Sequence, residues 1–289
     1  MQYWCPAGTA TPSAQIRGWN AWVAYDLSSV GNAMGTERVV LEKGTDGIRA
    51  KEYAKHATAE YWDQLWQSTN SSYGPALEGH LPHQLRSTIG HYTSPPSRVL
   101  EAGCGLGHFT IAMHARGYEA TGLDWADATV QQLQEEFPNI NFQRGDVRWS
   151  PFPAEYFDVV YSPGVCEHFE EGPDAVLLDA YRILRPRGLL FVSTPYLNPL
   201  RQHRWGKDDG QPEGDFYQYL FTQPGMTATL KRLGFQVITA KAYGVWSGLA
   251  LEWPALGRLS IGKAAAVLDQ SQIVTRRFGS TCIWVARKP

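Results

Sequence analysis

The chain has 289 residues, which at about 100–200 residues per domain corresponds to one large domain or two small ones. Hydrophobic residues make up 43% and charged residues 19%, a composition that excludes a disordered chain, a coiled coil and a collagen-like fibre. The formal net charge is −2, so an overall electrostatic attraction to nucleic acid or anionic lipid is not expected. No stretch reaches about 18 consecutive apolar residues, and no membrane span is predicted.

The cysteines and the N-terminal residues favour a cytoplasmic protein. Cys5, Cys104, Cys166 and Cys282 are scattered without a C-x-x-C pair. This pattern argues against a disulfide framework and against a cysteine-rich zinc site, and a reducing compartment suits it better. The first residues lack a basic start followed by an apolar run, so they do not resemble a secretory signal.

The first part of the chain has little regular patterning. Residues 1–50 favour an irregular arm that can include a hairpin, because Gly, Ser and Thr interrupt the short apolar clusters. Residues 51–69 are predicted to be helical, since Tyr53, Ala57, Tyr61 and Leu65 recur at spacings typical of one helix face. Tyr61 and Trp62 could cover a bound ligand, and a helix that only packs is the alternative.

From residue 97 onward, short apolar runs alternate with longer helical patterns. This alternation predicts an α/β fold, doubly wound around a seven-stranded, mostly parallel sheet. The expected strands are 98–103, 118–124, 140–143, 157–161, 188–193, 235–240 and 282–286, and the expected helices are 109–116, 126–137, 174–184 and 224–233.

Two long segments interrupt this rhythm. Residues 196–222 and 244–280 show no clear element, and connections of that length are usually functional or disordered. We therefore predict a single domain over residues 1–289. It consists of an N-terminal arm and cap helix (1–95), a ligand-binding core (96–195), a lid insertion (196–223) and a C-terminal part with a second insertion (224–289).

A glycine-rich turn joins the first core strand to the first core helix. The segment Glu101-Ala-Gly103-Cys-Gly105-Leu-Gly107 allows a sharp turn and a close approach of backbone N–H groups to a ligand. Asp124 ends the second strand and Asp146 follows the third, so three acids are expected at the carboxyl ends of neighbouring strands, where such sheets bind ligands. For each acid alone, a helix N-cap is the alternative role.

The turn departs from a dinucleotide fingerprint. In G-x-G-x-x-G, a third glycine would stand where this chain has His108. A nicotinamide-dependent oxidoreductase is therefore a weaker alternative. Asp124 lies 23 residues after Glu101, close to the ~20-residue spacing at which an acid can accept hydrogen bonds from ribose hydroxyls.

Six stretches carry a family resemblance, and most of them fall between residues 97 and 195. That core resembles the class I S-adenosylmethionine-dependent methyltransferases, in particular the type 11 small-molecule group. The similar stretches are VLEAGCGLGHFT, TGLDWAD, QRGDV, FDVVYSPGVCEHF, RILRPRGLLFVSTP and YLFTQPGMTATLKRLGF. The resemblance implies a Rossmann-like methyltransferase fold, an enzyme, and S-adenosylmethionine as cofactor.

The resemblance also implies which residues contact the methionine end of the cofactor. Glu101 would lie beneath it, and the backbone at Gly103 and Gly105 would pass the methionine and the ribose. Ser162 and Pro163, at the end of the fourth strand, would offer a carbonyl to the ammonium group. The cofactor carries a sulfonium and an ammonium, and acidic or aromatic groups suit such cations.

At the nucleoside end, the resemblance implies a second group of contacts. Asp124 would accept hydrogen bonds from the ribose hydroxyls, and Trp125 would stack on the adenine. Asp146 would face the adenine amine, with the backbone of Val147 beside it.

Two histidines are candidate catalytic residues. His168, in a segment that resembles the family's x-x-E-H, could remove a proton from an acceptor hydroxyl, whereas packing or capping is the alternative. His203 lies in the predicted lid with Arg201 and Arg204, which together favour an anionic or polyhydroxylated acceptor. Some quinone-type relatives bind a metal through E-x-x-E-H, but Gly164 replaces the first Glu, so no metal site is predicted.

The sequence thus predicts methyl transfer to a small polar acceptor, more plausibly at oxygen, such as a sugar, glycolipid-precursor or natural-product hydroxyl. Nucleic acid is not an expected partner, because Ser162-Pro163-Gly164-Val165 stands where base-modifying enzymes carry Asn/Asp-Pro-Pro-aromatic. N-methylation of a small amine and a non-catalytic cofactor-binding module are the alternatives. No oligomeric state is predicted.

Overall fold

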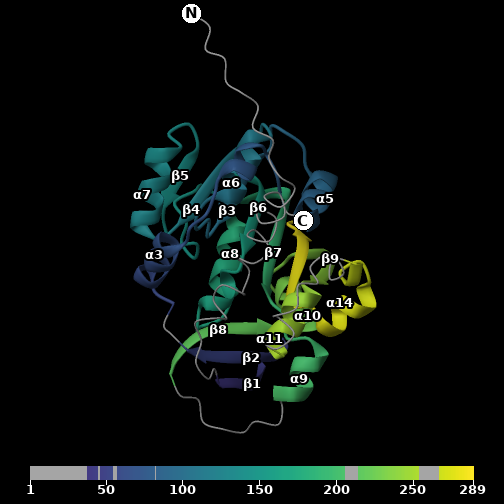
Figure 1. Ribbon diagram of the computed structural model, residues 1–289. Helices are drawn as coiled ribbons and strands as arrows, with labels where there is room; N and C mark the ends of the chain where they lie inside the picture. The colour runs from purple at the N-terminus through teal and green to yellow at the C-terminus, as the bar shows by residue number, and fades with distance from the viewer. Residues whose placement is uncertain (1–37, 45, 55–56, 82, 206–213, 254–266) are drawn as a thin grey trace, which may run out of the picture.

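A computed structural model describes residues 38–289 except 45, 55–56, 82, 206–213 and 254–266. Its centre is a seven-stranded sheet in the order β5-β4-β3-β6-β7-β10-β9, which confirms the predicted α/β fold (Figure 1). Only β10 runs antiparallel to its neighbours. The strands are β3 (Arg98–Ala102), β4 (Glu119–Asp124), β5 (Asn141–Arg144), β6 (Phe157–Pro163), β7 (Leu184–Pro195), β9 (Gln236–Tyr243) and β10 (Thr281–Arg287).

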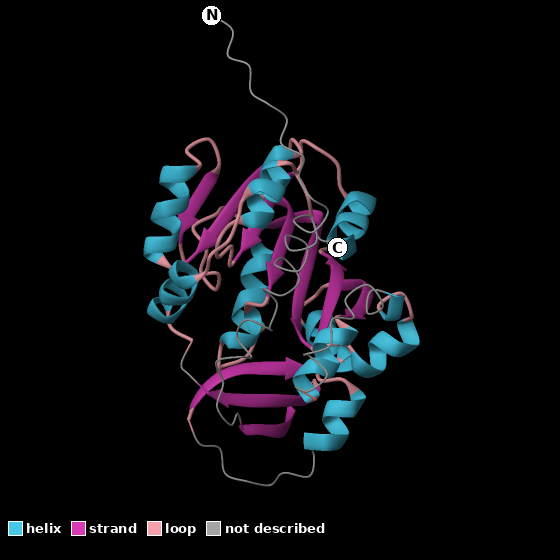
Figure 2. Cartoon of the chain, in the orientation of Figure 1, coloured by secondary structure: helices cyan, strands magenta, loops and turns pink. Residues whose placement is uncertain are grey.

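Helices cover both faces of this sheet and bury an apolar layer on each (Figure 2). One layer joins α8 and α10 to the sheet, and the other joins α5, α6 and α7. The described helices are α3 (Ala59–Ser68), α4 (Gly74–Leu77), α5 (His83–Tyr92), α6 (His108–Ala115), α7 (Asp127–Glu136), the 3-10 turn η1 (Cys166–His168), α8 (Asp174–Ile183), α9 (Pro199–Trp205), α10 (Gln223–Arg232), α11 (Val245–Glu252) and α14 (Gln272–Phe278). Across the described ranges, none of them combines the length and the apolar character that a membrane crossing requires.

A second, three-stranded antiparallel sheet lies across one end of the first. Its strands are β1 (Arg38–Gly44), β2 (Gly47–Ala54) and β8 (Asp215–Phe221), in that order. Arg232 on α10 holds the hairpin in place, because its guanidinium contacts Asp46 at 2.6 Å and Asp174 at 2.8 Å. This small sheet joins strands from before α3, β1 and β2, to a strand from after β7, β8.

The prediction of a helix over residues 51–69 is wrong in its first half. Residues up to Ala54 belong to β2, and the expected hairpin is the β1–β2 pair. The helix begins only at Ala59, where Thr58 accepts a hydrogen bond from the amide of Tyr61 at 3.2 Å. The helical spacing of Tyr53 and Ala57 is therefore coincidental. Residues 1–37, which the arm prediction also included, lie outside the described residues.

Both segments predicted to lack elements contain them. The first holds α9 and β8, and the second holds α11 and α14. Both predicted lid arginines contact Glu252, Arg201 at 3.0 Å and Arg204 at 3.4 Å, and of the two Arg204 alone remains exposed, at 40%. Arg201 and Glu252 are 3% and 6% exposed, so this ion pair fastens α9 to α11.

We predict that Arg201→Met lowers the free energy of unfolding by about 3 kcal/mol, because it leaves a buried carboxylate with a single, more distant partner. Urea unfolding followed by circular dichroism would measure the loss. Arg277→Met, at an exposed position of α14, is the control and should change stability by no more than about 0.5 kcal/mol. Equal stability of the two variants would contradict a structural role for the Arg201–Glu252 pair.

Candidate functional site

Four successive parallel strands end at the same pocket. Gly103 follows β3, Asp124 ends β4, Gly145 follows β5, and Gly164 follows β6, and all four residues line it. The carboxyl ends of parallel strands are where open α/β sheets bind ligands, since the helices that follow diverge to opposite faces there. Residues that are far apart in the sequence therefore lie together at this edge of the sheet.

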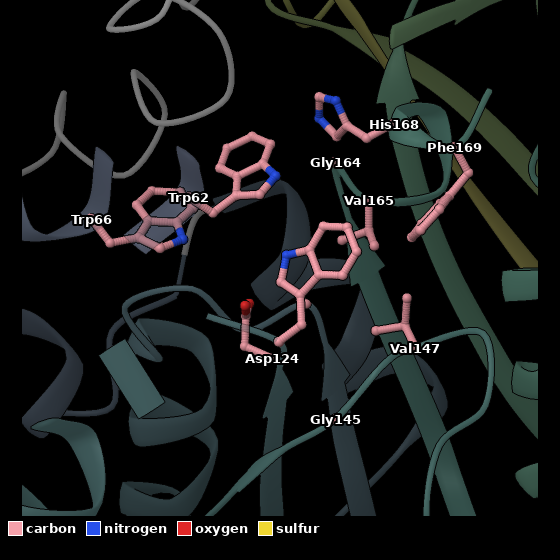
Figure 3. Close-up of a pocket in the computed structure, with 11 residues that line it drawn as sticks. Trp62, Trp66, Asp124, Gly145, Val147, Gly164, Val165, His168 and Phe169 are labelled. Carbon is pink, nitrogen blue, oxygen red and sulfur yellow. The ribbon is translucent and has the colours of Figure 1, made fainter. Parts of the chain in front are cut away.

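Aromatic, apolar and acidic side chains line the pocket. Figure 3 shows Trp62 and Trp66 on one side and Val147 and Phe169 on the other, with Asp124 between them. The full lining comprises Trp62, Trp66, Gly103, Asp124, Trp125, Gly145, Val147, Gly164, Val165, His168 and Phe169.

The glycine-rich turn is shaped by residues that cannot be replaced by larger ones. Gly103 and Gly105 adopt φ angles of 82° and 47°, in the left-handed region that favours glycine. A Cβ on Gly103 would overlap the Val165 side chain, and one on Gly105 would meet the Trp66 ring at 3.0 Å. The turn thus keeps the backbone open toward the pocket.

Asp124 connects this turn to the start of α7. Its Oδ2 accepts a hydrogen bond from the Gly105 amide at 2.8 Å, and its Oδ1 accepts one from the Ala126 amide at 3.0 Å. The side chain is 6% exposed, and burial raises its pKa even though these amide hydrogen bonds favour the charged form. Each oxygen retains a lone pair, so the carboxylate can also accept hydrogen bonds from a ligand in the pocket.

Glu101 lies beside this site on β3 and is also buried, at 6% exposure. Its Oε2 accepts hydrogen bonds from the Thr110 hydroxyl at 2.6 Å and the Thr110 amide at 3.0 Å. Burial raises the pKa of Glu101 to about 8, with Asp124 adding a smaller repulsion. Glu101 is not among the pocket-lining residues, and its hydrogen bonds join β3 to the first turn of α6.

His168 faces the pocket from η1. Its Nδ1 lies 2.9 Å from the carbonyl oxygen of Tyr217 on β8, and a carbonyl can only accept, so the proton sits on Nδ1. The lone pair is consequently on Nε2. Burial lowers the pKa of His168 to about 4, so the ring is neutral at physiological pH. Rings of Trp62 and Tyr217 contact it edge-on at 5.0 and 5.1 Å.

Helix α3 supplies the aromatic wall opposite. Trp62 and Trp66 are one turn apart and stack at 5.6 Å with an interplanar angle of 23°. Tyr61, from the same helix, contacts the ring of Tyr217 at 6.3 Å. Of the two residues that the sequence suggested as a cover for a ligand, Trp62 lines the pocket, together with Trp66, and Tyr61 is not among the lining residues.

The other expected nucleoside contacts divide into two groups. Trp125 and Val147 line the pocket. Asp146 does not, because Arg148 occupies it: the guanidinium contacts its carboxylate at 2.7 Å and also reaches Glu171 at 2.7 Å. Burial opposes the charged form of Asp146, yet these hydrogen bonds keep its pKa below the usual value.

Three further expected residues, Ser162, Pro163 and His203, are not among those that line the pocket. Ser162 is 1% exposed, and within the described structure its hydroxyl has no hydrogen-bond partner, while Pro163 ends β6 just before Gly164. His203 is exposed on α9 and is not among the residues that line the pocket.

Several lining residues were not anticipated from the sequence. Trp66 could have been identified, because it follows Trp62 by four residues and so shares its helix face. Gly145, Gly164 and Val165 follow strand ends, where the sheet topology predicts ligand contacts. Phe169 carries no local signal, since only the 3-10 turn directs its ring toward Trp125 at 5.8 Å.

The side chains that line the pocket fit a cationic nucleoside better than a diphosphate. Among the described residues that line the pocket, none is Lys or Arg, whereas three tryptophans, one phenylalanine and an aspartate are present. Aromatic faces and carboxylates attract cations, and a diphosphate would need positive groups. Within the described ranges, we also find no group of three or more His, Cys, Asp or Glu side chains arranged to hold a metal ion.

Comparisons with known proteins agree with this chemistry. Residues 77–240, more than half of the chain, match the family model described as a methyltransferase domain. The chain is 31% identical over 153 residues to "Probable S-adenosylmethionine-dependent methyltransferase" of Mycolicibacterium smegmatis, which covers 53% of this chain and 56% of that one. It is 33% identical over 153 residues to the ubiquinone biosynthesis O-methyltransferase of Pseudomonas fluorescens, covering 51% of this chain and 65% of the other.

The chain therefore spans about half to two thirds of the length of these curated relatives. A solved structure, the S-adenosylmethionine-dependent methyltransferase from Mesorhizobium loti, superposes with a TM-score of 0.51 at 19% identity, over 75% of this chain and 100% of that one. At that identity, the likeness concerns the fold.

We predict that Glu101 makes stability fall with rising pH. Its folded-state pKa of about 8 lies above the ordinary glutamate pKa of 4.5, so the native state binds more protons than the unfolded chain and loses stability from about pH 4.5 up to about pH 8. The loss should be a few kcal/mol, at about 1.4 kcal/mol per pKa unit.

The measurement is the difference in free energy of unfolding between the wild-type protein and Glu101→Gln across this pH range. Glu136→Gln, at an exposed position of α7, is the control and should track the wild-type curve. If the curve for Glu101→Gln tracks the wild-type curve as well, the carboxyl is not held in its protonated form.

Proposed function

Because the chain belongs to the methyltransferase domain family, we propose that it transfers a methyl group from S-adenosylmethionine to a hydroxyl oxygen of a small polar acceptor. The pocket at the strand ends is the cofactor site in this proposal. Two features support this assignment: the aromatic and acidic lining of the pocket, and Gly103, where a Cβ would overlap the Val165 side chain.

The residues that would hold the cofactor divide along the pocket. Asp124 would accept hydrogen bonds from the ribose hydroxyls through the lone pairs that its amide contacts leave, and Trp125 and Val147 would flank the adenine. Gly103 and Gly105 would let the backbone lie against the methionine end, and Glu101, which is hydrogen-bonded to Thr110 at the start of α6, would lie beneath it. When bound, the cofactor supplies an electrophilic methyl group on a sulfonium sulfur.

The Ser162 and Pro163 assignments extend this proposal. A buried hydroxyl without a partner is costly, so the unpartnered Ser162 oxygen supports a polar ligand group near the end of β6. Asp146 would contribute at the adenine amine only if Arg148 released it, and we therefore give it a secondary role behind Asp124.

His168 is the observation that favours oxygen as the acceptor atom. The Tyr217 carbonyl fixes the proton on Nδ1 and leaves the Nε2 lone pair to accept the proton of a hydroxyl. With a pKa of about 4, the ring is already in its proton-accepting form across the neutral range. A hydroxyl is a poor nucleophile and benefits from such a base. The name of the Pseudomonas fluorescens relative, an O-methyltransferase, supports the same choice.

The acceptor would approach from the side of β8. Tyr217 and Tyr61 stand beside His168 there, and the predicted lid residue His203 lies farther away on α9. In this proposal His168 is the catalytic histidine and His203 has no part in proton transfer. A radiolabelled methyl-transfer assay on matched hydroxyl and amine acceptors tests the proposal, and label found only on amines would refute it.

We predict that His168→Ala lowers turnover by about 100-fold or more, because the base is lost. His114→Ala, at an exposed position of α6, is the control and should keep wild-type turnover. Wild-type turnover should show no acid limb from His168 above about pH 5, since its pKa is about 4. A near-normal rate in His168→Ala would assign the residue to packing alone.

We predict that Asp124→Ala weakens binding of S-adenosylhomocysteine by about 1–3 kcal/mol, the cost of leaving buried partners without their acceptor. Isothermal titration calorimetry gives the affinity. Asp127→Ala removes an exposed carboxylate three residues away and should leave the affinity unchanged. Equal affinities of wild type and Asp124→Ala would exclude Asp124 from the ribose site.

A further inference from the structure

Helix α3 forms one wall of the pocket, and its aromatic side chains are only partly buried. Trp62 and Trp66 line the pocket, but none of the ten residues of α3 is buried. A helix that buries little apolar surface belongs to the parts of a protein that open locally at low cost. Its position over the pocket therefore has to be secured by specific contacts.

Asp63 provides such contacts. Its Oδ1 accepts hydrogen bonds from the Thr129 amide at 2.9 Å and the Thr129 hydroxyl at 2.8 Å. Its Oδ2 accepts a third, longer one from the Ala128 amide at 3.3 Å. These amides belong to the first turn of α7, where helices have unpaired donors.

The first turn of α7 has no cap of its own. Its N-cap residue is Ala126, which makes no side-chain hydrogen bond. Asp63 takes over the role that an N-cap aspartate would have, although it lies 65 residues before Ala128. The negative carboxylate also lies where the positive end of the helix dipole favours it.

This contact lies beside the pocket and joins two elements that border it. Trp62 and Trp66 are close to Asp63 on α3, while Asp124 and Trp125 directly precede α7. We propose that Asp63 is a positioning residue that latches α3 onto α7 at the edge of the cofactor pocket and so controls how fast the cofactor enters and leaves. The inference rests on the proposed function, because it takes this pocket to be the cofactor site.

The test measures the latch with and without ligand. In the ligand-free protein, hydrogen–deuterium exchange of α3 peptides reports opening of the helix. In stopped-flow experiments, tryptophan fluorescence reports dissociation of S-adenosylhomocysteine. For Asp63→Ala we expect about tenfold or greater acceleration of both, as three charge-assisted hydrogen bonds are lost. The KM for S-adenosylmethionine should rise, while kcat at saturating cofactor changes less than threefold.

Two control variants separate the latch from general stabilisation of α7. Asp127→Ala removes a carboxylate from the same first turn without touching α3 and should leave both rates near wild type. Thr129→Val removes the hydroxyl donor, and its effect should be smaller in the Asp63→Ala background than in the wild type. Asp63→Asn keeps the side-chain shape and one accepting oxygen, so intermediate rates are expected if Asp63→Ala folds poorly.

The outcomes distinguish the latch from the cofactor assignment. Unchanged exchange of α3 or unchanged dissociation in both Asp63 variants would overturn the latch, as would equal acceleration in Asp127→Ala. If the wild-type protein itself fails to bind S-adenosylhomocysteine, the proposed function falls and the inference falls with it. Wild-type binding together with unaffected Asp63 variants would remove the latch alone.

Discussion

The pocket depends on one carboxylate, that of Asp124 at the end of β4. Its two oxygens accept hydrogen bonds from the amides of Gly105 and Ala126. A single side chain thus fixes the glycine-rich turn and the start of α7 relative to each other. Because it is buried, these hydrogen bonds act in a low dielectric, where they are stronger and where their loss would be costly. The aromatic walls are arranged around this fixed point.

The core of the fold could be predicted from the sequence because its signals are local. Apolar runs followed by glycine or aspartate define β3 to β5, and the glycines and acids at their ends were expected to gather at one edge. The pocket contains Gly103, Asp124, Trp125, Val147 and His168 from that expectation. The three-stranded sheet was not predictable in this way, because β8 pairs with β2 from 166 residues along the chain, as the buried Glu52–Gln218 contact shows.

Charged residues were the least predictable part of the site. Asp146 and Arg201 looked available for a ligand, yet Arg148 and Glu252 neutralise them in the folded chain. Only the local Asp146–Arg148 pair lies close enough in sequence to be suspected in advance. A sequence shows where a charge is, whereas its partner depends on which segments pack together. His168 is a residue that the sequence did identify, but its tautomer depends on a carbonyl 49 residues away on β8.

The three-stranded sheet has a consequence for how the molecule acquires its activity during synthesis. Its strands come from positions on either side of the whole cofactor-binding core, and the Glu52–Gln218 contact spans 166 residues. Closing so large a loop is entropically slow compared with forming adjacent βα units. The turns after β3 to β6 that line the pocket can thus come together before β8 has been made. The proton of His168 is fixed on Nδ1 only later, when β8 brings the Tyr217 carbonyl beside it.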